Sequence, residues 1–501
     1  MENIKFGEKL SKELILKLFL SIIPAIFWVV FLWNFWDKGI YILGFNATIF
    51  GFISLGLFIW VLRQKGYYTK YDLFWIIPMI LIFLSYSIYD NPFLKITSLL
   101  VLPAMFALFY NQAFLTDKKT RRWNFEFILK IIVRFFSFFT ALGQTAKLYL
   151  HLIMPAGQTK KNTIARIIGG IILFLIIALT VFIPLLSSAD ALFAEKMGVI
   201  YEWFLNIFSS VFVYKLLVGV ALTILIFSAL ASWGKKFDYK EKESSDKNID
   251  SIISGIVIGG VLCLYLLFLG IQVSSLWVGV LPFEFKQTES LVKSGFWQLL
   301  FLSIINILIY FFTYKKTKLF VQWILTAFTV ASLLLLASAG YRMGLYVTYY
   351  GFSYEKFFAS YTVIYCAILF IWLIIKLFAK QRANILKFLI VLFLWMYSIV
   401  AIFPVEQFIL RANIALSNIK ESRIRLFEMT MLSPDVLSTV KKYQQQGLLK
   451  EKAGYLSREK ENKQDEDFDW QPWIERQEKI ISDKIWYEKN LINIVSSAKS
   501  R

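Results

Sequence analysis

Five charged residues stand near the ends of long apolar stretches, where their side chains could form a binding site. They are Asp190, Lys293, Arg342, Glu406 and Arg411. Three of the five are basic, so a shared cluster would bind an anionic lipid headgroup or a peptide outside the cytoplasm. The alternatives are local, because Asp190 could cap a short helix and Arg342 could reach lipid phosphate.

Two amide side chains lie inside an apolar stretch. Gln298 and Asn306 fall on the helix predicted over Phe296–Thr313. Amides within a membrane span hydrogen-bond to neighbouring helices more often than they bind a substrate. We therefore predict helix-to-helix hydrogen bonds for both residues, with substrate binding as the alternative.

The sequence lacks the motifs of common catalytic and metal sites. It contains no phosphate-binding loop, no HExxH and no GxSxG, which disfavours ATPases, proteases and lipases. Cys263 and Cys366 each lie in an apolar run, and His151 has no histidine or cysteine near it in the sequence. We therefore predict no metal ion and no cofactor. No Asp or Glu lies deep in a predicted span, which disfavours a carrier coupled to protons.

The composition requires a membrane around most of the chain. Hydrophobic residues make up 58% of the sequence, more than one soluble core could bury. The formal net charge of +20 would suggest nucleic acid in a soluble protein, but no zinc-finger, RNA-binding or helix-turn-helix pattern accompanies it. Basic residues also gather on cytoplasmic loops of membrane proteins. We therefore predict membrane lipids as partners, including anionic headgroups, and no nucleic acid.

Apolar stretches of about 20 residues predict about eleven membrane-spanning helices. The predicted spans are Ile15–Trp36, Gly39–Leu62, Asp72–Tyr89, Pro92–Tyr110, Ile164–Leu186, Val211–Ala231, Ile252–Gly279, Phe296–Thr313, Leu319–Tyr341, Tyr361–Phe378 and Asn384–Phe403. The expected fold is an all-α, polytopic transmembrane helix bundle over residues 1–403. A small, polar and helical C-terminal region over residues 404–501 follows it.

The stretch Trp123–Met154 differs from the spans because charged residues interrupt it. Lys130, Arg134 and Lys147 alternate with bulky apolar side chains. A charge in the middle of the bilayer is costly, whereas a helix on the interface keeps each charge in water. We predict an interfacial amphipathic helix here, with both lysines open to labelling from the cytoplasm.

Basic residues mark every second loop between the predicted spans. They follow the second, fourth, sixth, eighth and tenth spans, whereas the other loops carry far fewer. Loops rich in Lys and Arg remain in the cytoplasm, so we predict a cytoplasmic N-terminus. An odd number of spans then places residues 404–501 outside the cytoplasm.

Two helices are predicted within the C-terminal region. Ser433 before Pro434 is typical of a helix start, and Gly447 is typical of a helix end. A second amphipathic pattern begins at Gln471 and includes Ile485 on its apolar face.

Several segments follow the pattern of a known group of proteins. They are Leu185–Phe193, Ser294–Leu300, Ser338–Tyr346, Tyr350–Ser353, Asn413 with Ile414, and Glu428–Leu437. In these segments the chain resembles the bacterial membrane families called domains of unknown function 4153 and 4173. The resemblance implies a bacterial cell-envelope protein of the same fold and brings no activity with it. Lys293 and Lys356 stand where the family tends to have arginine, which keeps the charge and loses bidentate geometry.

These observations leave three classes of function open. The expected class is a non-enzymatic role in envelope assembly, sensing or partner binding, including a protein partner on the C-terminal region. A transporter or lipid flippase is the alternative, and an integral membrane enzyme is the second alternative. A buried carboxylate facing a cavity would favour transport, and a cluster of acids or a metal would favour catalysis.

Overall fold

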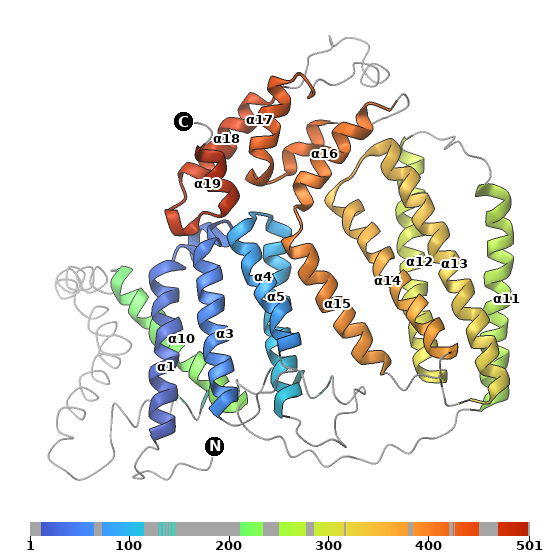
Figure 1. The fold of residues 1–501 in the computed structure, drawn as a ribbon, viewed down its shortest axis with the longest axis horizontal. Coiled ribbons are helices and arrows are strands. Elements are labelled where there is room, and N and C mark those ends of the chain that lie inside the picture. Colours follow the sequence, from blue (N-terminus) through green and yellow to red (C-terminus); the bar gives the residue numbers. More distant parts are fainter. Residues whose placement is uncertain are drawn as a thin grey trace, which may run out of the picture. The chain divides into compact units, whose positions relative to one another are not determined.

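A computed structural model of the chain describes residues 12–64, 73–114, 211–233, 250–276, 285–314, 317–378, 384–419, 426–449 and 469–498, with residue 424 and scattered positions from 129 to 145. Every regular element within these ranges is a helix (Figure 1). The predicted all-α fold is therefore confirmed. The helices divide between two compact units.

Seven helices within the described ranges are long and apolar enough to cross a membrane. A bent pair, Leu16–Phe31 with Phe35–Ile42, would make an eighth span if it counts as one, with an angle of 60° between its parts. Two shorter apolar helices, Phe74–Ile88 and Leu300–Thr313, coincide with further predicted spans. The predicted span Ile164–Leu186 lies outside the described residues. The chain is a membrane protein with several spans, and the total of about eleven stays a prediction.

One compact unit contains the helices from the N-terminal part of the sequence. Its elements are α1 (Lys12–Phe31), α2 (Phe35–Lys38), η1 (Gly39–Ile42), α3 (Phe45–Gln64), α4 (Leu73–Ile88), α5 (Pro92–Phe114), α10 (Val211–Trp233) and η8 (Trp486–Glu488). Helix α1 packs along α10 and against α3. The segment Ile485–Asn490, which contains η8, belongs to this unit although it lies near the end of the sequence.

The segment Ile485–Asn490 fits closely against Gly44, just before α3. Phe45 N donates a hydrogen bond to the carbonyl oxygen of Lys489 at 3.2 Å. A Cβ atom at Gly44 would overlap the carbonyl oxygens of Glu488 and Lys489. The close approach of the two backbones therefore requires glycine at this position.

The other unit contains the remaining helices and residues 88–91. Its elements are α11 (Ser251–Leu276), α12 (Phe285–Thr313), α13 (Leu319–Tyr350), α14 (Tyr354–Phe378), α15 (Ile385–Ile402), α16 (Val405–Ser417), η5 (Leu426–Met431), η6 (Pro434–Val436), α17 (Leu437–Gln445), α18 (Gln471–Ser482) and α19 (Leu491–Ala498). Helix α13 packs against α11, α12 and α14 and so joins them. Buried side chains such as Tyr265, Phe328 and Phe370 fill these contacts.

Helix α13 is longer than the sequence predicted. The prediction ended this span at Tyr341 and put Arg342 beyond it, but the helix continues through Arg342 to Tyr350. This prediction was wrong because a single arginine, itself a good helix former, does not end a helix. The helix ends at Gly351, whose φ of +71° is a conformation that side chains disfavour.

The first of the two helices predicted in the C-terminal region, the one after Ser433, has the predicted boundaries. Ser433 precedes Pro434, and its Oγ accepts a hydrogen bond from Asp435 N at 3.3 Å. One turn of 3-10 helix then leads into α17, and Gly447 follows α17 with a φ of +66°. The start and the end signals in this segment are therefore confirmed.

The second C-terminal helix is shorter than predicted. Helix α18 begins at Gln471, as the sequence indicates, and buries Trp473 and Ile481. It ends at Ser482, so Ile485 lies outside the helix and is 40% exposed. The prediction that Ile485 lies on the buried face was wrong because apolar spacing continued past the end of the helix.

The stretch predicted to lie on the interface is described only in part. Its described positions are helical, and exposed apolar side chains follow one another at helical spacing: Leu129, Ile132, Val133, Phe136 and Phe139. Lys130, Arg134 and Lys147 lie outside the described residues. Placement of this helix on the membrane surface stays a prediction.

Candidate functional site

A buried carboxyl group lies where α16 follows α15. Phe403 and Pro404 separate the two helices, since proline has no N–H to continue α15. Glu406 then falls in the first turn of α16 and is only 2% exposed. Its carboxylate accepts hydrogen bonds from Ser433 N at 2.9 Å, from Ser433 Oγ at 2.5 Å and from the Tyr354 hydroxyl. Glu406 therefore joins α16 to the start of α14 and to the segment before α17.

Burial changes the acidity of Glu406. Loss of solvation raises the pKa of its carboxyl to about 7. The hydrogen bonds from Ser433 and Tyr354 lower this pKa, and the Asp90 carboxylate raises it further. Glu406 therefore exchanges its proton near neutral pH.

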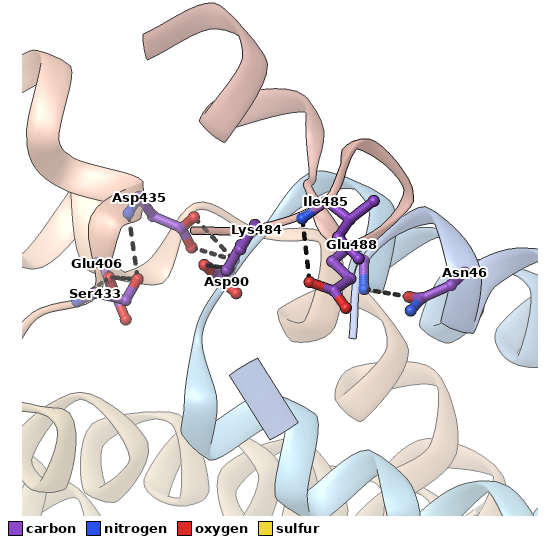
Figure 2. A network of polar contacts seen from close by, with 9 residues as sticks. Asn46, Asp90, Glu406, Ser433, Asp435, Lys484, Ile485 and Glu488 are labelled. Atoms are coloured by element: carbon purple, nitrogen blue, oxygen red, sulfur yellow. Dashed lines mark hydrogen bonds and ion pairs between the residues drawn. The ribbon is translucent and has the colours of Figure 1, made fainter. Parts of the chain in front are cut away.

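A second set of buried polar contacts lies beside Glu406 (Figure 2). The two carboxylate oxygens of Asp435 accept hydrogen bonds from Asp90 N at 2.8 and 2.7 Å. The Asp90 carboxylate pairs with the ammonium of Lys484, which lies 394 positions away in the sequence. Both side chains of this ion pair are at most 5% exposed. We call these residues the buried polar network: Asp90, Tyr354, Glu406, Ser433, Asp435 and Lys484.

The charges in the buried polar network do not balance if every carboxyl group is ionised. Asp90, Glu406 and Asp435 supply three carboxyl groups, whereas Lys484 supplies one ammonium. Burial, and after it the Asp435 carboxylate, also raises the pKa of the neighbouring Tyr89 hydroxyl. A proton on Glu406 therefore lowers the repulsion among buried negative charges.

An asparagine holds the turn between α13 and α14. Asn413 Oδ1 accepts a hydrogen bond from Phe352 N at 2.6 Å, and Asn413 Nδ2 donates to the Phe352 carbonyl oxygen at 2.8 Å. Asn413 Nδ2 also contacts Met429 Sδ at 3.0 Å. A Cβ atom at Gly351 would lie 2.7 Å from Asn413 Oδ1, so this turn depends on glycine in two ways.

Lys356 stabilises the same turn from the α14 side. Its Nζ donates to the carbonyl oxygens of Tyr350 and Gly351, at 3.2 and 3.0 Å, and lies 4.4 Å from the centre of the Tyr346 ring. A cation at the C-terminus of a helix also favours the helix dipole. Single carbonyl oxygens do not need the planar fork of arginine, so lysine is adequate here.

Three of the segments that suggested a family resemblance meet at this place. They are Tyr350–Ser353, Asn413 and Glu428–Leu437. The first is the turn after α13, the second is its hydrogen-bond partner, and the third contains Met429 and Ser433. The contacts among these segments attach α16 and η5 to the turn between α13 and α14.

An open groove lies between α16, α17 and α19. It has a volume of about 760 Å³ and is lined by Arg411, Leu437, Ser438, Thr439, Lys441, Lys442, Tyr443, Gln445 and Ser496. Three of these residues are cationic and none is acidic. We call it the basic groove. In contrast to the buried polar network, it is open to a ligand.

The structure places the five predicted site residues in different settings. Glu406 and Arg411 both lie on α16, but Glu406 is buried whereas Arg411 is exposed and lines the basic groove. Arg342 is half-buried within α13, and Lys293 lies within α12. Asp190 lies outside the described residues. A single cluster of all five residues stays a prediction.

The two predicted intramembrane amides also differ from each other. Asn306 is buried, accepts a hydrogen bond from the Tyr265 hydroxyl at 2.8 Å and donates to Ser332 Oγ at 2.8 Å. These contacts join α12 to α11 and α13, which is the helix-to-helix role that its position suggested. Gln298 is exposed on α12.

Sequence reasoning missed four members of the buried polar network: Asp90, Tyr354, Asp435 and Lys484. Asp90 precedes Asn91 and Pro92 between two apolar runs, which is a turn signal but not a sign of ion pairing. Asp435 follows Ser433 and Pro434, which indicated only a helix start. Nothing in the sequence around Lys484 indicates its partner.

The buried polar network and the basic groove differ in what a ligand can reach. Among the described residues no three His, Cys, Asp or Glu side chains are placed to hold a metal ion. Glu406, the carboxyl that titrates near neutral pH, is enclosed by its hydrogen-bond donors and is 2% exposed. In the basic groove, by contrast, the cations Arg411 and Lys442 are exposed.

The helices and the site together define a polytopic membrane protein in which shorter helices follow the last long apolar helix. The chain belongs to the family described as a domain of unknown function, DUF4153, whose model matches residues 76–443. The match includes Asp90, Glu406, Asp435 and the cations of the basic groove, and it stops before Lys484. No curated protein and no solved structure matches the chain.

Proposed function

We propose that the protein is a bacterial cell-envelope protein that works by binding rather than by catalysis. Its C-terminal region, residues 404–501, would bind the partner outside the cytoplasm. The observation that carries the proposal is the contrast between two sets of charges. Three carboxyl groups are enclosed in the buried polar network, whereas Arg411, Lys441 and Lys442 line an open groove.

The distribution of basic loops supports the outer location. Lys318 precedes α13, and Lys387 lies in the first turn of α15, so the basic segments lie at one end of these helices. The turn at Gly351 and the start of α16 lie at the other ends of the same helices. Basic ends remain in the cytoplasm, which favours an outer position for α16 and the helices after it.

A proton-coupled transporter or an enzyme that uses acid–base catalysis would need a carboxyl group that a substrate or a proton can reach. Glu406 has the acidity expected of such a group, because its pKa is about 7. Its three hydrogen bonds and its burial instead suit a group that attaches α16 to α14. Replacing Glu406 therefore separates binding from catalysis and transport.

The test compares three kinds of living cells. They carry the wild-type protein, the Glu406→Gln variant, or a double variant with both Arg411→Gln and Lys442→Gln. Lipid and metabolite profiles of the cells are measured after the amount of inserted protein has been matched by immunoblotting. We expect Glu406→Gln cells to match wild type, because glutamine preserves the hydrogen bonds of a protonated carboxyl.

A different result would favour a rival function. If a lipid or metabolite accumulates in Glu406→Gln cells while the protein is inserted at the wild-type level, Glu406 takes part in turnover or transport. The proposal that the protein works by binding alone would then be wrong.

A further inference from the structure

We propose that the basic groove binds a phosphate group of an anionic ligand. This inference rests on the proposed function and names the chemical class of the partner. The shared chemistry is a phosphate ester, which the headgroup of an anionic phospholipid or a soluble compound could supply.

Two helices of one compact unit supply the charges of the groove. Arg411 comes from α16, and Lys441 and Lys442 come from α17. Ser438, Lys441, Lys442 and Gln445 are spaced at three, four and seven positions, so they lie on one face of α17. One face of a helix thus presents two ammonium groups beside the guanidinium of α16.

Of the three cations, Arg411 and Lys442 are the most available to a ligand. Lys441 forms an ion pair with Glu478 of α18, which uses part of its charge. Arg411 and Lys442 are exposed and line the groove. A guanidinium can bind two phosphate oxygens at once, and an ammonium adds a compact charge beside it.

The size and polarity of the groove indicate the rest of the ligand. A volume of about 760 Å³ is far larger than one phosphate ion and falls among the pockets that hold small molecules. Leu437 is the only apolar residue among the nine described residues that line it. The hydroxyls of Ser438, Thr439 and Tyr443 suit a polar headgroup rather than an acyl chain.

A buried hydroxyl gives independent support. Ser496 of α19 lines the groove and is 6% exposed, and its Oγ has no hydrogen-bond partner within the described part of the chain. Burying a hydroxyl without a partner is unfavourable. A phosphate oxygen in the groove would supply the missing acceptor.

The test uses the full-length protein in nanodiscs and two kinds of probe. The first probe is the membrane itself, as discs of phosphatidylcholine alone or mixed with phosphatidylglycerol. The second is glycerol phosphate added in solution to the phosphatidylcholine discs. Native mass spectrometry measures retained lipid, and calorimetry measures binding of the soluble compound.

We expect at least one of the two phosphate probes to bind wild-type protein. Arg411→Gln and Lys442→Gln should each weaken that binding by about tenfold, because each removes a charged hydrogen bond. Arg476→Gln on the exposed face of α18 is the matched control and should bind as wild type. Ser496→Ala should weaken binding without lowering the thermal midpoint of the unbound protein, since the hydroxyl lacks a partner there.

The outcomes separate the two sources and the two proposals. Retention of phosphatidylglycerol without binding of glycerol phosphate assigns a lipid, and the reverse assigns a soluble phosphate ester. If neither probe binds, or if Arg411→Gln, Lys442→Gln and Arg476→Gln bind alike, the phosphate inference is wrong while the proposed binding function can still hold. Accumulation of a metabolite in Glu406→Gln cells would instead contradict the proposed function and leave the phosphate site standing.

Discussion

At the scale of single residues, burial gives Glu406 a property that its sequence position does not indicate. The ordinary pKa of the group, 4.5, rises to about 7 in the folded protein. The folded state therefore holds a proton that the unfolded chain releases between these two values. The free energy of unfolding that the Glu406 carboxyl contributes is fully present below about pH 4.5. It is lost as the pH rises through about 7.

Glu406→Gln should remove this pH dependence. Glutamine resembles the protonated carboxyl, and the hydroxyls of Ser433 and Tyr354 can accept as well as donate hydrogen bonds. Thermal unfolding of the purified protein, measured from about pH 5 to about pH 8, should show the variant gaining about 1–3 kcal/mol on wild type as the pH rises. Parallel curves for the two proteins would show that Glu406 does not titrate in this range.

Gly351 gives a second prediction at this scale. Gly351→Ala would place a Cβ atom 2.7 Å from Asn413 Oδ1 at a φ of +71°, and should cost about 2–3 kcal/mol. Gly447→Ala is the matched control, because its φ is +66° but nothing lies within 4 Å of its Cβ position. It should cost only about 1 kcal/mol. Equal losses of thermal stability would show that Asn413 yields to the methyl group.

At the scale of elements, helix positions follow from the sequence better than helix ends do. The apolar run predicted over Asn384–Phe403 became α15 because its length and composition leave few other structures for a membrane segment. The end of α13 was missed because Arg342 marks a change in polarity, whereas the helix stops only at Gly351.

The candidate site was predictable only where a signal is local. Glu406 and Arg411 were recognised because they are charged and lie just beyond an apolar run. The pairing of Asp90 with Lys484 joins positions 394 residues apart, so it depends on the packed structure. No property of either short segment could have indicated it.

The buried ion pair between Asp90 and Lys484 provides a test of how strongly Lys484 holds Asp90. Lys484→Met should cost about 3 kcal/mol, because it leaves the buried Asp90 carboxylate without its ammonium. Asp90→Asn combined with Lys484→Met should recover part of this loss, since both charges of the ion pair are then removed together. The thermal midpoints of the two single variants and the double variant measure the coupling, and additive losses would show that the pair contributes nothing.

A close contact between backbones gives the other test at this scale. Gly44→Ala should cost about 2 kcal/mol, because its methyl group would overlap the carbonyl oxygens of Glu488 and Lys489. Gly56→Ala, on α3 with nothing within 4 Å of its Cβ position, is the control and should leave the thermal midpoint unchanged or raise it. Equal midpoints for the two variants would show that the segment Ile485–Asn490 can move away.

At the scale of the whole molecule, the account depends on which side of the membrane carries the C-terminal region. Binding of an envelope partner in the basic groove requires α16 and α17 to lie outside the cytoplasm. The same distribution of basic residues predicts that Lys318, just before α13, lies inside the cytoplasm. These two positions should therefore respond oppositely to a reagent that cannot cross the membrane.

The most direct test is maleimide labelling of intact cells, with Cys263 and Cys366 replaced by alanine to remove the native thiols. Lys442→Cys should be labelled as strongly in intact cells as in permeabilised ones, whereas Lys318→Cys should be labelled only after permeabilisation. Labelling of Lys442→Cys only after permeabilisation would place the basic groove in the cytoplasm and contradict the proposed outer binding site.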